Sequence, residues 1–577
     1  MNDKISAKTR KAFSRFDILA ALCLLAGFVF LLWKAPYGYA QADENFYLSI
    51  PYRLFQGDSL LAHEWNSAQL FSFLLYPAMK LFISFNGSTE GIFLFFRYLY
   101  TAALLLGGIY VYISLRRVQP VGALLGALLL MLYTPLHIMS LSYNTMCILL
   151  LAAAGATMVR AASAKAPAWI SGLLFAGAVL CCPYLVVIYA VYSLLCLLPR
   201  FTKKLSIPAF SLAFWLRFTA GCAVLALVFL VFVLSRCSLS DAIASIPLIF
   251  NDTETFYTSF SYHLFKYCEA IYGNFWVNSF SLSWPILALI MALDKKRKAH
   301  RCWYIVPAML ITATYFAYYV FSDRTVNYLM FPMNILGGFA FFLCNKRDIR
   351  PFVFLYIPGL LYSLCIHFAS NLGLMSIASA MSVSCIASAI YICTLAKELY
   401  CEDKKLITRI VGLGLLLALM MQLSVLSWFR SRYTMWDDDT SELSITLTEG
   451  PQKGIITGEG HASRYYKLIE DSSPVREAQA DCVLYIFTDS WLYLMDDARM
   501  GSFSPWISTL YPETDIARLE SYWQLYPERM PDTIFIGERK YDITLGSDKS
   551  GKLELLMDAL PGSWTVTETE SGCILRP

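Results

Sequence analysis

Two pairs of ionisable residues lie close together near the start of the chain. Asp43 and Glu44 occur in "GYAQADENFYLSIPYRLFQGDSL", and His63 and Glu64 occur in "AHEWNSAQ" shortly after it. These carboxylates follow the first long apolar run of the chain, and Asp43 and Glu44 are therefore candidates for a functional role. The four side chains together would also suit a divalent cation that prefers oxygen ligands, although solvated loop residues explain the same pattern.

A structural role explains Asp43 equally well at this level. Asp is a preferred N-cap residue, and the segment "ENFYLSIPYRLF" that follows Asp43 has the pattern of an amphipathic helix. A capping carboxylate is also held in a fixed position. The two interpretations are therefore compatible.

The elements that would position these residues are membrane spans. Hydrophobic residues make up 57% of the 577 residues and charged residues only 15%, whereas charged residues reach about 25% in ordinary soluble proteins. Nothing in this composition indicates a nucleic-acid partner. Apolar runs of about 20 residues predict thirteen spans once the long run at 167–199 is split at Pro183. The other predicted spans are 17–34, 90–115, 120–138, 144–159, 213–235, 275–293, 302–321, 327–344, 351–368, 375–396 and 406–428.

The distribution of charge predicts which side each loop faces. With the N-terminus in the cytoplasm, the inner segments hold 24 Lys and Arg and the outer segments hold seven, as the positive-inside rule requires. Residues 1–428 carry 32 Lys and Arg against 17 Asp and Glu, while residues 429–577 carry 14 against 25. An odd number of spans places this acidic tail outside the cell. The first apolar run is predicted to be a span and not a cleaved signal.

The chain is predicted to have two domains, a transmembrane domain at 1–428 and a small extracytoplasmic α/β domain at 429–577. In the second domain, strand-like segments alternate with helix-like ones, which is typical of an α/β fold. Its two cysteines, Cys482 and Cys573, could form a disulfide outside the cell. The strand-like segments are 453–458, 482–488 and 532–537, and the helix-like segments are 462–470 and 518–526.

Two outer segments are long enough to build a site. The first outer loop, 35–89, contains two amphipathic stretches, Phe46–Phe55 and Gln69–Phe85, which are predicted to lie in the membrane interface. Another outer segment, 236–274, is predicted to cover a site.

The first outer loop resembles that of a known family. In "DENFYLSIPYRLFQGDSL" an acidic pair precedes an aromatic residue and a run ending in Gly, and the polar cluster "HEWNSAQLFSFLLYP" follows. This arrangement is similar to the GT-C membrane glycosyltransferases, specifically the bacterial family 39-type group of protein O-mannosyltransferases and lipid A aminoarabinose transferases. The resemblance implies a mainly α, polytopic GT-C fold of about thirteen spans with a small C-terminal α/β domain.

The resemblance also implies an activity. Such an enzyme transfers a sugar from a polyprenyl-phosphate-linked donor to an envelope polymer, glycolipid or protein on the outer face of the cell membrane. Asp43 matches the family's general base, and direct displacement of the phosphate would invert the anomeric centre. Glu44 would orient Asp43 or the acceptor.

The resemblance extends to substrate-binding residues, with departures. The polar cluster has Asn66, Ser67 and Ala68 where the family often carries His-Pro-Pro. The segment "TPLHIMSLSYNTM" has no acid where several relatives place a second catalytic carboxylate. Cationic side chains on the outer face would bind the donor phosphate. Arg324 and Lys266 are the first candidates, and Arg53 and Arg97 are secondary ones. The predicted substrate-binding residues are Arg324, Lys266, Arg53, Tyr47, Glu64, His63, Tyr143 and Asn144.

Two other classes of function stay open. A lipid or solute transporter, or flippase, would carry ionisable residues inside its spans, whereas here the acids Asp17 and Glu398 lie at span edges. A non-catalytic sensor or assembly protein would tolerate the loss of Asp43. No cofactor is predicted with certainty, and a divalent metal stays possible.

Overall fold

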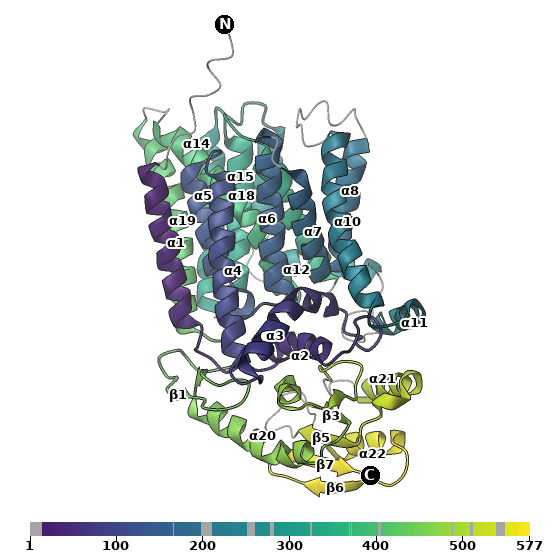
Figure 1. Ribbon diagram of the computed structural model, residues 1–577. Helices are drawn as coiled ribbons and strands as arrows, with labels where there is room; N and C mark the ends of the chain where they lie inside the picture. The colour runs from purple at the N-terminus through teal and green to yellow at the C-terminus, as the bar shows by residue number, and fades with distance from the viewer. Residues whose placement is uncertain are drawn as a thin grey trace.

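The computed structural model describes residues 14–164, 167–197, 211–250, 260–276, 282–322, 326–368, 370, 372–401, 405–486, 489–507, 512–537 and 549–577. A bundle of long helices makes up most of the molecule, and a small α/β domain lies against one end of it (Figure 1). Helix α1 (Arg15–Lys34) begins at the opposite end of the bundle and runs toward this domain. The mainly helical fold with a small C-terminal α/β domain is as predicted.

Hydropathy identifies the spans. Among the described residues, seven helices are long and apolar enough to cross a membrane, so the chain is a multi-pass membrane protein. Six shorter apolar helices coincide with the remaining predicted spans. The seven are α1, α4 (Ile92–Leu115), α6 (Tyr143–Ala164), α10 (Leu212–Leu234), α14 (Arg301–Ser322), α18 (Ser382–Cys401) and α19 (Leu406–Arg432). The six are α5 (Pro120–Leu132), α7 (Ala168–Cys181), α8 (Val186–Leu197), α13 (Ser283–Leu293), α15 (Met330–Leu343) and α16 (Ile357–His367).

Small residues allow the spans to pack closely. A Cβ atom on Gly172 of α7 would lie 1.9 Å from the carbonyl oxygen of Phe218, and one on Gly221 of α10 would lie 2.0 Å from that of Trp169. The two backbones therefore touch, as is typical of helix pairs in membranes. Short segments complete the bundle, namely η2 (Pro135–His137), η3 (Pro183–Leu185), η5 (Asn327–Leu329), the π-helical η6 (Phe352–Tyr356) and α17 (Leu374–Ala380).

The first outer loop contains the two expected helices, but they differ in environment. Helix α3 (Ser72–Asn86), preceded by η1 (Gln69–Phe71), exposes Leu81 and Phe85, as an interfacial helix would. Helix α2 (Asp43–Phe55) is buried from Glu44 to Leu54, because the C-terminal domain covers it from below (Figure 1). The prediction that α2 lies in the membrane interface stays a prediction.

The outer segment at 236–274 is helical where it is described. It forms α11 (Leu239–Ile249) and α12 (Phe260–Trp276). Ile249 of α11 belongs to the same apolar cluster as residues of the C-terminal domain. The predicted covering role of this segment stays a prediction.

The C-terminal domain is built around a five-stranded sheet of order β4-β3-β5-β7-β6, with β3 parallel to β4 and β5 and the other pairs antiparallel. A two-stranded ribbon of β1 and β2 precedes it. The strands are β1 (Ile445–Thr446), β2 (Ile456–Thr457), β3 (Cys482–Ile486), β4 (Arg499–Met500), β5 (Thr533–Gly537), β6 (Thr565–Glu568) and β7 (Gly572–Arg576). The helices are α20 (Glu459–Glu477), η7 (Ser490–Met495), α21 (Pro512–Leu525), η8 (Pro527–Arg529) and α22 (Lys549–Ala559).

The sheet separates the two cysteines of this domain. Cys482 lies on β3 and Cys573 on β7, with β5 between them. Two strand spacings alone amount to about 9.6 Å, beyond the ~7 Å between Cα atoms that a disulfide tolerates. Both thiols are free and buried, so the suggested disulfide is wrong.

Arg53 of α2 links the first outer loop to the C-terminal domain. Its Nε donates to Asp58 Oδ2 at 2.6 Å, and its Nη1 donates to Glu64 Oε2 at 3.2 Å. Its Nη2 donates to the carbonyl oxygen of Ser502 and to the hydroxyl of Tyr522, both at 2.7 Å. The side chain is completely buried. Because a guanidinium has five N–H groups, these four bonds leave little capacity for another ligand.

Further contacts make this junction a shared core. Arg529 of the C-terminal domain also pairs with Asp58. Burial alone would raise the pKa of Asp58, but the guanidiniums of Arg53 and Arg529 outweigh it and lower the pKa. The indole of Trp65 stacks on Phe503, with ring centroids 5.7 Å apart. The first outer loop and the C-terminal domain therefore pack as one unit.

Replacing Arg53 by glutamine should destabilise the protein strongly. The substitution leaves Glu64 buried without a cation, and breaking a buried ion pair costs about 3–5 kcal/mol. Arg432→Gln is the matched control, because the pair of Arg432 with Asp439 is half exposed and such pairs contribute about 0–1 kcal/mol. Melting of the detergent-solubilised variants tests this, and equal melting temperatures for both would contradict it.

Candidate active site

Helix α2 begins at Asp43, and the residue before it is strained. Ala42 is the N-cap, with φ 50° and ψ −111°, and no side chain caps the helix. Positive φ is unfavourable for alanine, and such strain gathers at functional sites. Asp43 is therefore the first helical residue, and the capping role considered from the sequence is wrong.

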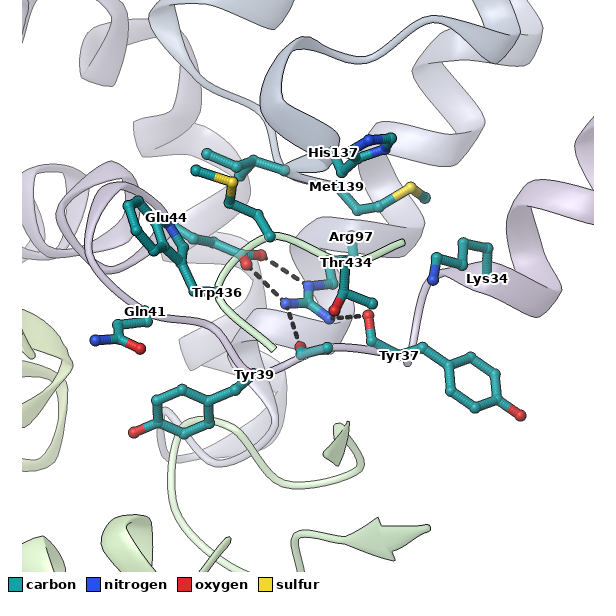
Figure 2. Close-up of a pocket in the computed structure, with 13 residues that line it drawn as sticks. Lys34, Tyr37, Tyr39, Gln41, Glu44, Arg97, His137, Met139, Thr434 and Trp436 are labelled. Carbon is teal, nitrogen blue, oxygen red and sulfur yellow. Dashed lines mark hydrogen bonds and ion pairs between the residues drawn. The ribbon is translucent and has the colours of Figure 1, made fainter. Parts of the chain in front are cut away.

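Glu44 is held by a buried arginine (Figure 2). Arg97 of α4 donates from Nε to Glu44 Oε1 at 2.8 Å and from Nη2 to Glu44 Oε2 at 2.7 Å. Arg97 also donates to the carbonyl oxygens of Ala35, Tyr37 and Gly38, at the end of α1. Both charged side chains are almost completely buried. Glu44 thus fixes the start of α2 against α1 and α4, and Arg97 is already neutralised.

The Asp43 carboxylate has no partner among the described residues. Within the described ranges, no hydrogen bond or ion pair involves this side chain, which is partly buried. Burial raises the pKa of Asp43 to about 6. A carboxylate with this pKa is a stronger base than an ordinary one and is still ionised at neutral pH.

Aromatic rings gather next to Asp43. Burial raises the pKa of the Tyr47 hydroxyl, and the charge of Asp43 raises it further. The ring of Tyr47 packs edge-on against Tyr143, at the start of α6, with centroids 5.8 Å apart. Phe46 and Phe71 pack against the same ring of Tyr143. The structure thus brings together Asp43, Tyr47 and Tyr143 of the predicted site.

Asn144 lines a cavity of about 20 Å³ between η2, α6, η5, α16 and α17. The amide oxygen of Asn327 in its wall accepts hydrogen bonds from the Tyr133 hydroxyl and the Leu136 N–H. Its amide nitrogen has no partner among the described residues. The other polar residues that line the cavity are Tyr362, Ser370, Ser376 and Ser379. The sequence prediction missed these residues, because single Asn and Ser residues near span ends carry little signal.

His63 and Glu64 belong to the junction with the C-terminal domain. Burial lowers the pKa of His63 to about 4, so its ring is neutral, and its Nδ1 accepts the Ser59 N–H at 3.0 Å. Burial raises the pKa of Glu64, although Arg53 opposes this. Across the described part of the chain, no three or more His, Cys, Asp or Glu side chains gather as metal ligands do.

The cationic residues predicted to bind substrate differ in their contacts. Arg53 makes four hydrogen bonds within the junction, and its role as a substrate ligand stays a prediction. Lys266 lies exposed on α12 and pairs with Glu269 at 2.6 Å. Arg324 lies outside the described residues.

The chain is similar over nearly its whole length to a crystal structure of ArnT from Cupriavidus metallidurans bound to undecaprenyl phosphate. The two share 11% sequence identity with a TM-score of 0.48, and the similarity covers 98% of each chain. No family model and no curated protein matches the chain.

Asp43→Asn should raise the stability of the protein at neutral pH. Because the folded-state pKa of about 6 lies above the ordinary aspartate value of 3.8, the folded state binds the proton more tightly than the unfolded state. The stabilisation from protonation is therefore full below pH ~3.8 and is lost as the pH rises through about 6. The melting temperature of Asp43→Asn minus that of the wild type should grow over this window. The exposed Asp497→Asn is the control, and a pH-independent difference for Asp43→Asn would contradict the assignment.

Proposed function

We propose that the chain is an inverting membrane glycosyltransferase of the GT-C type. It would transfer a sugar from a polyprenyl-phosphate-linked donor to a hydroxyl group of an envelope polymer, glycolipid or protein. The observation that carries the proposal is the carboxylate of Asp43, which has no partner in the described part of the chain, has a raised pKa and lies where the bundle meets the outer domain. The first-loop motif supports it.

The chemistry needs one base. Asp43 takes the proton of the acceptor hydroxyl while the acceptor oxygen forms a bond to the anomeric carbon. The bond from that carbon to the phosphate oxygen breaks, and polyprenyl phosphate leaves as an anion. Attack from the face opposite the leaving group inverts the anomeric centre. Glu44 acts as a positioning residue for Asp43, because its pair with Arg97 fixes the start of α2.

The donor would lie along the bundle. Its sugar hydroxyls would meet the cavity of Asn144 and Asn327, next to Tyr143, and Tyr47 would contact the reacting groups. Its phosphate would meet Arg324 and Lys266. An apolar cavity of about 500 Å³ between α13, α15 and α16 has the lining that an isoprenoid chain requires.

The acidic residues of the membrane-spanning helices do not support the transporter alternative. Asp17 pairs with Arg116 at 2.6 Å, and Glu398 pairs with Arg301 at 2.9 Å. Both acids lie near span ends, where ion pairs are ordinary, and neither lines a described cavity. We therefore retain sugar transfer as the proposed function.

Asp43→Asn should abolish transfer. Loss of a general base costs about 10²–10⁴ in rate, so membranes with this variant should move almost no label from polyprenyl-phosphate sugars to acceptor. Wild-type activity should fall as the pH drops below about 6, because the base becomes protonated. The control is Asp497→Asn, which should behave as wild type. Normal transfer by a folded Asp43→Asn would refute the mechanism.

The proposed topology places the N-terminus in the cytoplasm and the C-terminal domain outside, and α1 starts at the end of the bundle opposite that domain (Figure 1). The exposed thiols Cys268 and Cys401 are first changed to serine. On intact cells, a membrane-impermeant maleimide should then label Asp497→Cys and spare Lys296→Cys. The reverse pattern would overturn the orientation.

A further inference from the structure

Three basic side chains are buried together where α1, α4 and α19 end nearest the C-terminal domain. Lys34 is the last residue of α1, Arg97 lies on α4, and Arg430 lies in the last turn of α19. Their exposed fractions are 2%, 3% and 1%. Lys34 and Arg97 line a cavity of about 20 Å³ (Figure 2). The rest of its wall includes Glu44, Gln41, His137, Met139, Thr434 and Trp436.

Only one of the three has an anion as a direct partner among the described residues. Glu44 neutralises Arg97. The ammonium of Lys34 donates one hydrogen bond, to the hydroxyl of Thr440, although it can donate three. Figure 2 shows the ammonium directed toward Arg97 and Thr434.

The carboxylates near Lys34 have other hydrogen-bond or ion-pair partners. Asp437 and Asp439 act electrostatically on Lys34. Asp439 pairs with Arg432 at 2.8 Å. Asp437 accepts the Tyr39 N–H and the Thr457 hydroxyl, both at 2.6 Å.

Arg430 is the least satisfied of the three. Its Nε and Nη1 have no hydrogen-bond partner among the described residues, and its Nη2 contacts the neutral sulfur of Met139. Its electrostatic neighbours are Tyr100 and Arg97, neither of which is an anion. Met139 lines the cavity, and the flexible methionine side chain can turn aside to admit a ligand to the guanidinium.

Burial without an anion is costly. An unpaired buried charge costs several kcal/mol, whereas a cation at a helix C-terminus gains only about 0.3–1 kcal/mol from the helix dipole. The ends of α1 and α19 therefore do not account for Lys34 and Arg430. A bound anion would account for the burial of these two cations.

The wall of the cavity is strained as well. His137 and Trp436 have φ values of 61° and 63°, and both line the cavity. Ala42, between the lining residues Gln41 and Glu44, also has positive φ. Strained non-glycine residues cost about 1–3 kcal/mol each and gather at ligand clamps.

We propose that this cavity binds a phosphoryl anion, held by Lys34 and Arg430. The exposed indoles of Trp33 on α1 and Trp428 on α19 mark the level of the membrane surface, where phosphoryl groups of lipids lie. The residues that hold this anion differ from Arg324 and Lys266, which we assign to the donor phosphate, and the binding does not depend on sugar transfer. The phosphoryl group belongs to a lipid headgroup or to free phosphate.

The test measures melting of the full chain in phosphate-free, lipid-free detergent. Inorganic phosphate, against chloride at equal ionic strength, and phosphatidylglycerol, against phosphatidylcholine, are titrated in separate arms. At least one should raise the wild-type melting temperature, because binding to the folded state stabilises it. Lys34→Met and Arg430→Met should each weaken the apparent affinity by about tenfold or more. Lys80→Met, an exposed lysine on α3, is the control and should respond as wild type.

The outcomes discriminate clearly. A response to phosphatidylglycerol alone identifies a lipid headgroup, and a response to inorganic phosphate identifies a free phosphoryl group; both support the site. Without ligand, the methionine variants should be at least as stable as the wild type, because an uncompensated charge is gone. The proposal is overturned if no ligand stabilises the wild type, or if the variants keep the response. Variants that melt lower without ligand, or fail to fold, also overturn it by giving the cations a structural role.

Discussion

The buried guanidinium of Arg97 is the constraint on which the candidate active site depends. A charge buried at the membrane surface requires an anion and hydrogen-bond acceptors, and Arg97 finds them in Glu44 and in three carbonyl oxygens after α1. The chain between α1 and α2 is thereby fixed in a strained path through Ala42. Because Asp43 directly precedes Glu44, the pairing of Glu44 with Arg97 also fixes the position of Asp43. Of the two adjacent acids, Glu44 is therefore paired with Arg97, while Asp43 has no partner among the described residues.

A second constraint joins the transmembrane and C-terminal domains. Backbone hydrogen bonds connect Gly38 with Ile456 and Gly91 with Gly450, while Trp65 inserts into the apolar core of the C-terminal domain. The predicted boundary near residue 428 therefore follows the change in composition and not the packing. The first outer loop belongs structurally with the tail.

The parts of the fold that depend on local pattern could be predicted from the sequence. Spans follow from runs of apolar residues, and the alternation of strands and helices in the tail follows from short-range periodicity. Ion-pair partners could not be predicted in this way. Arg53 was predicted to bind phosphate as an outer cation. Its partners Ser502 and Tyr522 could not be foreseen, because they lie over 440 positions away in the sequence. The environment of Asp43 was equally hidden, since its raised pKa arises from burial by distant elements.

The insertion of Arg53 and Trp65 into the last part of the chain has a consequence for biosynthesis. Ribosomes deliver the N-terminal segments first, so the first outer loop reaches its compartment long before its partners Ser502 and Tyr522 are made. Until then Arg53 and Glu64 face water, and α2 lacks the surface that holds it. The surroundings of α2 are therefore completed only once the C-terminal domain has been made, so that a partly synthesised chain lacks the surface that covers this helix.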